Sequence, residues 1–395
     1  MAVSATAVGE PPRLPVQWAL VGVGAAALAG GALFLGADGW RRGVLLLVGG
    51  MLGVSLYHAA FGFTAAYRNA IVRREISGVA AQLVMLAAAM LLFAPVLAQG
   101  EMFGQRVAGA VAPVGVQVAV GSFLFALGMQ LGGGCGSGTL YTIGGGSTRM
   151  LVTLAAFCVG GFWASLDMPF WWEAPGWGSI SLARELGWEI ALSLQLGALL
   201  LVWLGLRRWG RGAGQRPLWG DGLTWRRALT GPWPLLLSAG LLAALNWVTL
   251  VVAGHPWTIT WGFTLWGAKA AAALGWDPSA SPFWTGGFTQ RALGRGVLED
   301  ITSVMNIGII LGALTAAGLA GKFAPVFRLP TRSLLAAAIG GLLMGYGARI
   351  AFGCNIGAFF SGVASTSLHG WLWIVCAIAG TWLGVRLRPW FGLTN

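Results

Sequence analysis

Two cysteines in glycine-rich segments are the residues of this sequence best suited to chemistry. They are Cys135, within 132–139, and Cys354, within 353–362. Their immediate neighbours are small or polar: Gly134, Gly136, Gly353 and Asn355. Glycine lets backbone N–H groups approach a ligand closely, and concave runs of such donors bind anions. A thiol adds a weak, polarisable donor and acceptor. These residue types predict a site for a small anion that contains sulfur.

Packing is the competing interpretation of each cysteine, because a cysteine in an apolar helix usually serves as a small packing residue. We apply it to Cys158 and Cys376, whose surroundings are ordinary apolar runs. For Cys135 and Cys354 it stays an alternative, although packing alone does not demand glycine around both. The sequence has no CxxC pair, no clustered zinc ligands and no GxSxG, HExxH or phosphate-loop motif. We therefore expect no cofactor and no enzymatic activity.

The composition shows what must position the two cysteines. Of 395 residues, 57% are hydrophobic and 9% charged, whereas soluble domains are usually about a quarter charged. Runs of about 17 to 22 apolar residues are long enough to span a bilayer. We place them near 17–37, 43–63, 79–98, 114–131, 150–166, 190–206, 235–253, 302–321, 334–352 and 370–386. A further run at 258–275 contains Lys269 and either spans or enters only partway. The sequence predicts an all-α polytopic membrane protein.

The net charge of +12 is explained by membrane topology rather than by nucleic acid. The basic residues lie in short loops between apolar runs, as the positive-inside rule describes. The segment 207–232 is rich in arginine and is predicted to be cytoplasmic, whereas 167–189 is acidic and is predicted to be external. The partners expected on this basis are the lipid bilayer and a small anion, with no nucleic acid.

The two cysteine segments also repeat. Gly128 precedes Cys135 and Gly347 precedes Cys354 by the same interval, and a second cysteine follows each at a similar distance. Non-helical backbone at membrane depth is tolerated only inside protein, so each segment is a candidate re-entrant loop. The opposed loop charges predict inverted repeats. We divide the chain into an N-terminal segment with the first helix, a first repeat, a cytoplasmic linker and a second repeat, at 1–42, 43–206, 207–232 and 233–395.

Two polar residues inside apolar runs have two interpretations each. Arg349 lies five positions before Cys354. A charge within a membrane helix is a functional candidate, but an arginine near a helix end also extends its head group to the interface. Asn306 either bonds one helix to another or lines the path.

The sequence resembles the YeeE/YedE family of bacterial inner-membrane proteins from about 43 to 388. The most specific matches are Gly340–Arg349 and the segment from Gly353 to Ser361; 132–139, 263–269 and 306–308 match more weakly. The resemblance implies an hourglass-like fold, with tilted helices and re-entrant loops, and thiosulfate uptake. It also implies a constriction where cysteines, here Cys135 and Cys354, pass the substrate along by S–H···S hydrogen bonds. Gly62 stands where the family often has a third cysteine.

The leading prediction is a permease for a small sulfur-containing anion, most simply thiosulfate. The alternatives are a selenium or other sulfur compound as substrate, or a membrane sulfur relay. In the relay, a persulfide on Cys135 or Cys354 is passed to a small cytoplasmic sulfur-carrier protein. A further alternative is a membrane subunit with a purely structural role.

Overall fold

Helices form most of the part of the chain that the structure describes. The computed structural model describes residues 15–210, 215–220 and 222–395. Residues 1–14 of the predicted N-terminal segment, and Arg211 and Asp221 of the predicted linker, lie outside the described residues. Within the described part, ten helical segments are long and apolar enough to cross a membrane. The prediction of an all-α polytopic membrane protein is therefore confirmed.

The described residues of the first half form ten helices and four short strands. The helices are α1 (Trp18–Ala37), α2 (Trp40–His58), α3 (Phe63–Arg73), α4 (Ser77–Gln99), α5 (Val116–Gly132), α6 (Gly136–Gly144), α7 (Thr148–Leu166), α8 (Met168–Trp172), α9 (Leu182–Leu186) and α10 (Trp188–Trp209). The strands are β1 (Glu101–Met102), β2 (Gln105–Arg106), β3 (Pro113–Gly115) and β4 (Gly176–Ser179). β1 pairs with β2 and β3 with β4, both antiparallel.

Among its described residues, the second half contains helices and connecting segments, and Ser367 forms an isolated β-bridge with Ser181. Its α-helices are α11 (Trp225–Thr230), α12 (Leu235–Ala253), α13 (Thr260–Ala273), α14 (Gly287–Gly294), α15 (Ile301–Leu319), α16 (Thr331–Ile350), α17 (Ser361–Ala364) and α18 (Leu368–Leu387). A π-helix, η3 (Asn355–Phe360), follows Cys354. Short 3₁₀ turns are η1 (Pro278–Ala280), η2 (Val297–Glu299) and η4 (Arg388–Phe391). The run at 258–275 forms α13, which is not one of the ten candidate spans.

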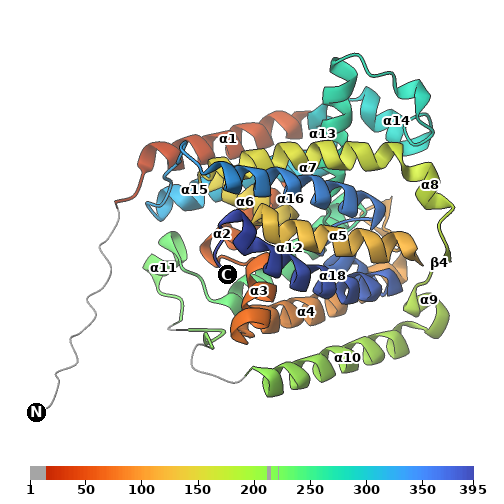
Figure 1. Ribbon diagram of the computed structural model, residues 1–395, viewed down its shortest axis with the longest axis horizontal. Coiled ribbons are helices and arrows are strands. Elements are labelled where there is room, and N and C mark those ends of the chain that lie inside the picture. Colours follow the sequence, from red (N-terminus) through yellow and green to blue (C-terminus); the bar gives the residue numbers. More distant parts are fainter. Residues whose placement is uncertain (1–14, 211–214, 221) are drawn as a thin grey trace, which may run out of the picture.

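The long helices run side by side between two ends of the molecule (Figure 1). We call one end the linker face, which carries α11 and the C-terminal residues, and the other the strand face, which carries β3, β4, α8 and α9. At the linker face, Arg388 donates to the carbonyl of Gln130 near the end of α5. At the strand face, the N–H of Leu368 at the start of α18 donates to the carbonyl of Ile180.

Glycines let the central helices α5 and α16 approach closely. A Cβ on Gly121 would lie 2.6 Å from the carbonyl oxygen of Gly347, and one on Gly128 would lie 2.6 Å from that of Gly340. Small residues at such crossings are typical of packed membrane helices. α7 packs on α16 and α18 on α5, while α2 packs on α15 and α4 on α12.

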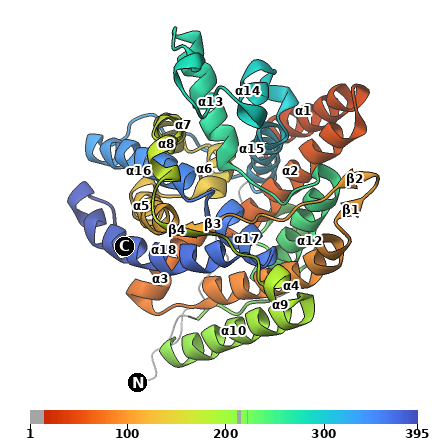
Figure 2. The ribbon, with the colours of Figure 1, turned by 90° about the vertical axis from the view of Figure 1, so that its right-hand side faces the viewer.

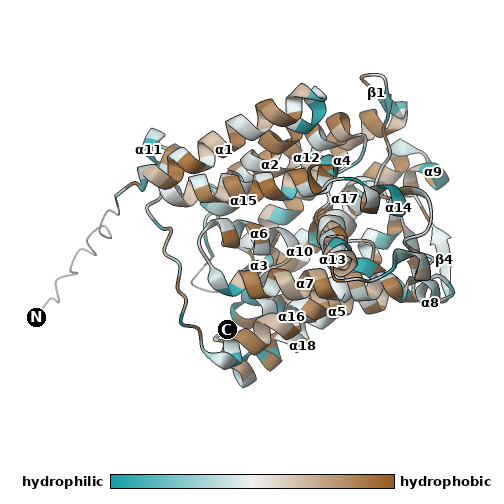
Figure 3. Cartoon of the chain, turned by 90° about the horizontal axis from the view of Figure 1, so that it is seen from above, coloured by the Kyte–Doolittle hydropathy of each residue, from teal (hydrophilic) through white to brown (hydrophobic). Residues whose placement is uncertain are grey.

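The outer helices present apolar side chains outward, as a protein in lipid requires. On α1, Leu33 is 79% exposed, and on α10, Leu201 is 70% exposed. Seen from a second side, α1 and α10 lie at the edge of the bundle (Figure 2). Hydropathy follows the same pattern, because apolar residues cover the long helices and polar ones gather in the terminal loops (Figure 3).

Candidate functional site

Each of the two cysteines occupies the position just before a short helix. Cys135 precedes α6 with φ −81° and ψ −165°, and Cys354 precedes η3 with φ −99° and ψ −165°. The carbonyl of Cys135 accepts from the N–H of Thr139 at 2.8 Å, and that of Cys354 accepts from the N–H of Ala358 at 2.9 Å. The two segments therefore adopt the same local conformation, although they lie far apart in the sequence.

In both segments, the glycine before the cysteine lies close to the backbone of the turn that follows the cysteine. A Cβ on Gly134 would lie 3.0 Å from the carbonyl carbon of Gly138. A Cβ on Gly353 would lie 2.7 Å from the N of Ala358, and Gly353 has φ +148°, which favours glycine. The backbone folds back over the following turn in each case, so a side chain at Gly134 would be tight and one at Gly353 would clash.

The structure brings the two cysteine segments together. A Cβ on Gly136, directly after Cys135, would lie 3.1 Å from the sulfur of Cys354. The same position faces Ile259 and Thr260 at the start of α13. Cys135 is 1% exposed and Cys354 fully buried, so neither thiol is open to solvent in this conformation. The predicted residues Cys135, Gly136 and Cys354 thus form one closed site.

The two segments reach this site from opposite ends of the bundle. Cys135 lies between α5 and α7, at the end of α5 that Arg388 ties to the linker face. Cys354 lies between α16 and α18, and α18 begins at the strand face.

Hydrogen-bond donors surround both sulfurs. The backbone N–H groups of Ser137 and Gly138 lie near the sulfur of Cys135, and the Ser137 hydroxyl is 3.4 Å from it. The N–H of Ile356 points at the sulfur of Cys354 at 3.5 Å, with the N–H of Gly357 nearby. Both cysteines also precede the positively polarised N-terminal end of a helix. This arrangement of oriented donors suits an anion.

Several fully buried polar atoms at the site have no partner. Both the nitrogen and the oxygen of the Asn355 side chain are unpaired, and the Tyr67 hydroxyl lies close to this side chain without a well-formed hydrogen bond. Asn306 donates to the carbonyl of Ile259 at 3.0 Å, but its own oxygen is unpaired. Buried polar atoms are nearly always satisfied in proteins. Those at this site therefore indicate a place where a polar ligand or water belongs.

The π-helix after Cys354 is a second unusual feature. In η3 the carbonyl of Cys354 accepts from the N–H of Phe359 at 3.3 Å as well as from Ala358. π-helical turns are rare and occur mostly at functional sites. Such a turn has alternative hydrogen-bond registers close at hand, so it gives the Cys354 segment a way to move.

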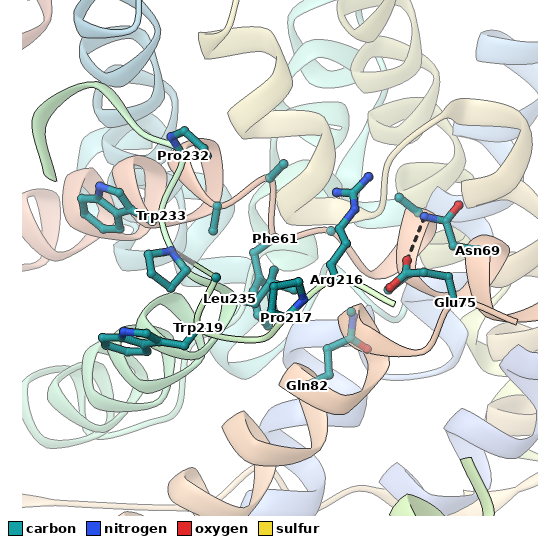
Figure 4. Close-up of a pocket in the computed structure, with 18 of the residues that line it drawn as sticks. Phe61, Asn69, Glu75, Gln82, Arg216, Pro217, Trp219, Pro232, Trp233 and Leu235 are labelled. Atoms are coloured by element: carbon teal, nitrogen blue, oxygen red, sulfur yellow. Dashed lines mark hydrogen bonds between the residues drawn. The ribbon is translucent and has the colours of Figure 1, made fainter. Parts of the chain in front are cut away.

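Gly62 lies between this site and a cavity at the linker face. A Cβ on Gly62 would be 3.2 Å from the hydroxyl of Tyr141, which belongs to α6. Gly62 also lines a cavity of about 310 Å³. The exposed side chain of Arg216 lies there between Phe61 and a hydrogen-bonded pair, Asn69 and Glu75 (Figure 4).

Arg349 is placed apart from the thiol pair. Its guanidinium lies 5.2 Å from the ring centre of Phe283, in the segment between α13 and α14, and its Nε is buried without a partner. Cys158 and Cys376 are partly buried on α7 and α18. Sequence reasoning did not single out Tyr67, Tyr141 or Thr260, because only the fold brings their helices to the cysteines.

The chain is similar to known transport proteins. Residues 58–383 match the family described as Sulphur transport. The chain is 30% identical to a thiosulfate transporter, TsuA, of Spirochaeta thermophila over 85% of this chain and 96% of that protein. It is 24% identical to the Escherichia coli thiosulfate transporter TsuA over 68% of this chain and 74% of that protein. A probable transporter of Escherichia coli, YedE, is 32% identical over 41% of this chain and 39% of its own length.

Proposed function

The chain belongs to the sulphur-transport family, and on this premise we propose that it carries thiosulfate across the inner membrane past Cys135 and Cys354. The family and the ten apolar helices make it a multi-pass membrane protein, and a bacterial transporter of this kind belongs in the inner membrane. The observation that supports the proposal is that both thiols are buried and that Gly136, next to Cys135, lies against the sulfur of Cys354.

The chemistry of the site favours an anion with a terminal sulfur. A doubly charged ion inside the bilayer loses its water, which only oriented donors can replace. The N–H groups after both cysteines supply such donors. They attract any small anion, but the thiols prefer a soft, polarisable sulfur to a hard oxygen. Their weak hydrogen bonds also let the ion leave, and conduction requires release as well as binding.

The proposal includes inverted repeats with two re-entrant loops in an hourglass arrangement. The Gly121–Gly347 and Gly128–Gly340 contacts support it, because a two-fold axis that exchanges the halves would map one pair onto the other. The pairing of α7 with α16 and of α18 with α5 follows the same exchange. Under this scheme 43–206 and 233–395 are the two repeats, and 207–232 is the cytoplasmic linker between them.

At the linker face, we place the exit next to Gly62. The cavity there supports this position, because Gly62 contacts Tyr141 on the helix that begins after Cys135. A small cytoplasmic sulfur-carrier protein would receive the substrate at this face. Since Gly62 supplies no thiol, only two cysteines act in this chain. Other sulfur or selenium oxyanions are therefore the alternative substrates.

Uptake of labelled thiosulfate into cells or proteoliposomes tests the proposal. We expect Cys135→Ser and Cys354→Ser to lose most uptake while folding normally, because serine keeps the size but replaces a soft donor with a hard one. Cys158→Ser is the matched control and should retain uptake. Sulfate, sulfite and selenium analogues as competitors identify the substrate. Normal uptake by both serine variants of the pair would return Cys135 and Cys354 to the packing interpretation.

A further inference from the structure

An apolar groove separates α10 from the rest of the bundle at the linker-face half of the molecule. Its volume is about 540 Å³, and its walls come from α3, α4, α10 and α18. α10 makes its main contacts with α4 and α9, and its buried residues are Ala191, Gln195 and Leu199. From Leu199 onward α10 therefore stands away from the bundle, and it lies at the edge in both ribbon views (Figures 1 and 2).

Three residues that line this otherwise apolar groove each carry a buried polar atom without a partner. These atoms are the hydroxyl of Tyr67, the Oε1 of Gln82 and the hydroxyl of Thr381, from three different helices. Each residue lies five or six positions from the linker-face end of its helix, roughly 8–9 Å at 1.5 Å per residue. Hydrocarbon alone would leave all three atoms unsatisfied at this depth. The groove therefore suits an occupant that is apolar along most of its length and polar near one end.

The end of the groove at the linker face is basic and aromatic. Trp209 and Trp382 line the groove there. The guanidinium of Arg74 lies 4.8 Å from the Trp209 ring, and that of Arg386 lies 3.5 Å from the Trp382 ring. Among the described residues, the ion pair joins Arg42 and Asp38, and neither Arg74 nor Arg386 has a carboxylate partner. Basic and aromatic side chains at this position are typical of a site for an anionic head group.

We infer that the groove binds one anionic phospholipid of the bilayer. One acyl chain lies between α10 and α18, and the phosphate lies at Arg74 and Arg386. The glycerol ester oxygens, which lie deeper than the phosphate, accept from Tyr67 and Thr381. This site is separate from the thiosulfate site and does not depend on its assignment.

The floor of the groove connects it to the cysteine segments. Phe359 of η3 lines the groove, and Tyr67 reaches the Asn355 side chain in the same π-helix. A bound chain therefore packs against the turn that follows Cys354. Lipid bound in the groove should stabilise that turn and hold α10 against the bundle.

Thermal unfolding of the purified full chain in neutral detergent tests the inference. We expect phosphatidylglycerol to raise the unfolding midpoint by about 3 °C or more, and phosphatidylcholine with the same chains to do so far less. The double variant Arg74→Gln/Arg386→Gln should lose this difference. Arg328→Gln is the matched control, because it removes an exposed arginine from a loop that does not line the groove. It should keep the difference.

A second variant fills the groove itself. Ile374→Trp places a larger side chain in the wall, and it should reduce the phosphatidylglycerol that copurifies, measured by mass spectrometry of the extracted lipid. Equal stabilisation by the two lipids, or full stabilisation of the double arginine variant, would overturn the inference. A wild-type dimer that the Ile374→Trp change converts to monomer would overturn it too, because the groove would then hold a second copy of the chain.

Discussion

The substitution Gly136→Ala tests whether the meeting point of the two cysteine segments is the transport path. The added methyl would lie 3.1 Å from the Cys354 sulfur and 3.4 Å from a methyl of Ile259. Contacts of this length are tighter than usual, so the neighbours must shift by a few tenths of an ångström. Gly136 is the first residue of α6 and needs no positive φ, so alanine suits its backbone. The methyl therefore narrows the site without breaking the fold.

Gly136→Ala should change uptake much more than it changes the free energy of unfolding. Alanine in place of glycine in a helix gains up to about 1 kcal/mol, which offsets the strain of the close contact. The free energy of unfolding should therefore change by no more than about 1 kcal/mol. An anion passing this point must also displace the methyl, so we expect thiosulfate uptake to fall at least about tenfold, or about 1.4 kcal/mol in the barrier.

The assay is initial-rate uptake of labelled thiosulfate, normalised to folded protein in the membrane. Gly22→Ala is the control, because a Cβ on Gly22 of α1 meets nothing within 4 Å. It should keep wild-type uptake. Gly353→Ala is a second comparison, in which we expect loss of folding, because the added methyl would contact backbone and Gly353 has a positive φ. Wild-type uptake by Gly136→Ala would refute the reasoning and place the path elsewhere.

Two further predictions concern the cavity and the topology. Gly62→Cys restores the third thiol of the family pattern next to the Tyr141 hydroxyl. Thiosulfate uptake should be unimpaired or raised. A sharp loss of uptake in a well-folded protein would count against an exit at Gly62. Single cysteines introduced as Arg216→Cys in the linker and Glu173→Cys at the strand face should react with an impermeant maleimide from opposite sides, Glu173→Cys from outside. Labelling of both from one side would contradict the inverted topology.

Much of the architecture could be predicted from local sequence. Apolar runs of membrane-spanning length identified the ten candidate spans, since length and hydropathy are properties of each segment alone. The glycines directly before Cys135 and Cys354 were found for the same reason, because the backbone approaches both positions closely. The run at 258–275 was ambiguous, and only tertiary packing decided it: α13 starts beside the buried cysteines and ends in the exposed segment before α14.

Local sequence patterns thus identified a membrane protein with two matching Gly-Cys segments and a resemblance to sulfur transporters. The tertiary structure alone decided that Gly136 lies against the Cys354 sulfur, that Gly62 reaches Tyr141 and that Arg349 lies against Phe283. It also decided that α10 leaves a groove above Tyr67 and Gln82. The physical reason is the distance along the chain over which each effect acts. Hydropathy and glycine conformation act within one segment, whereas these contacts depend on how separate helices cross, and no local pattern records that.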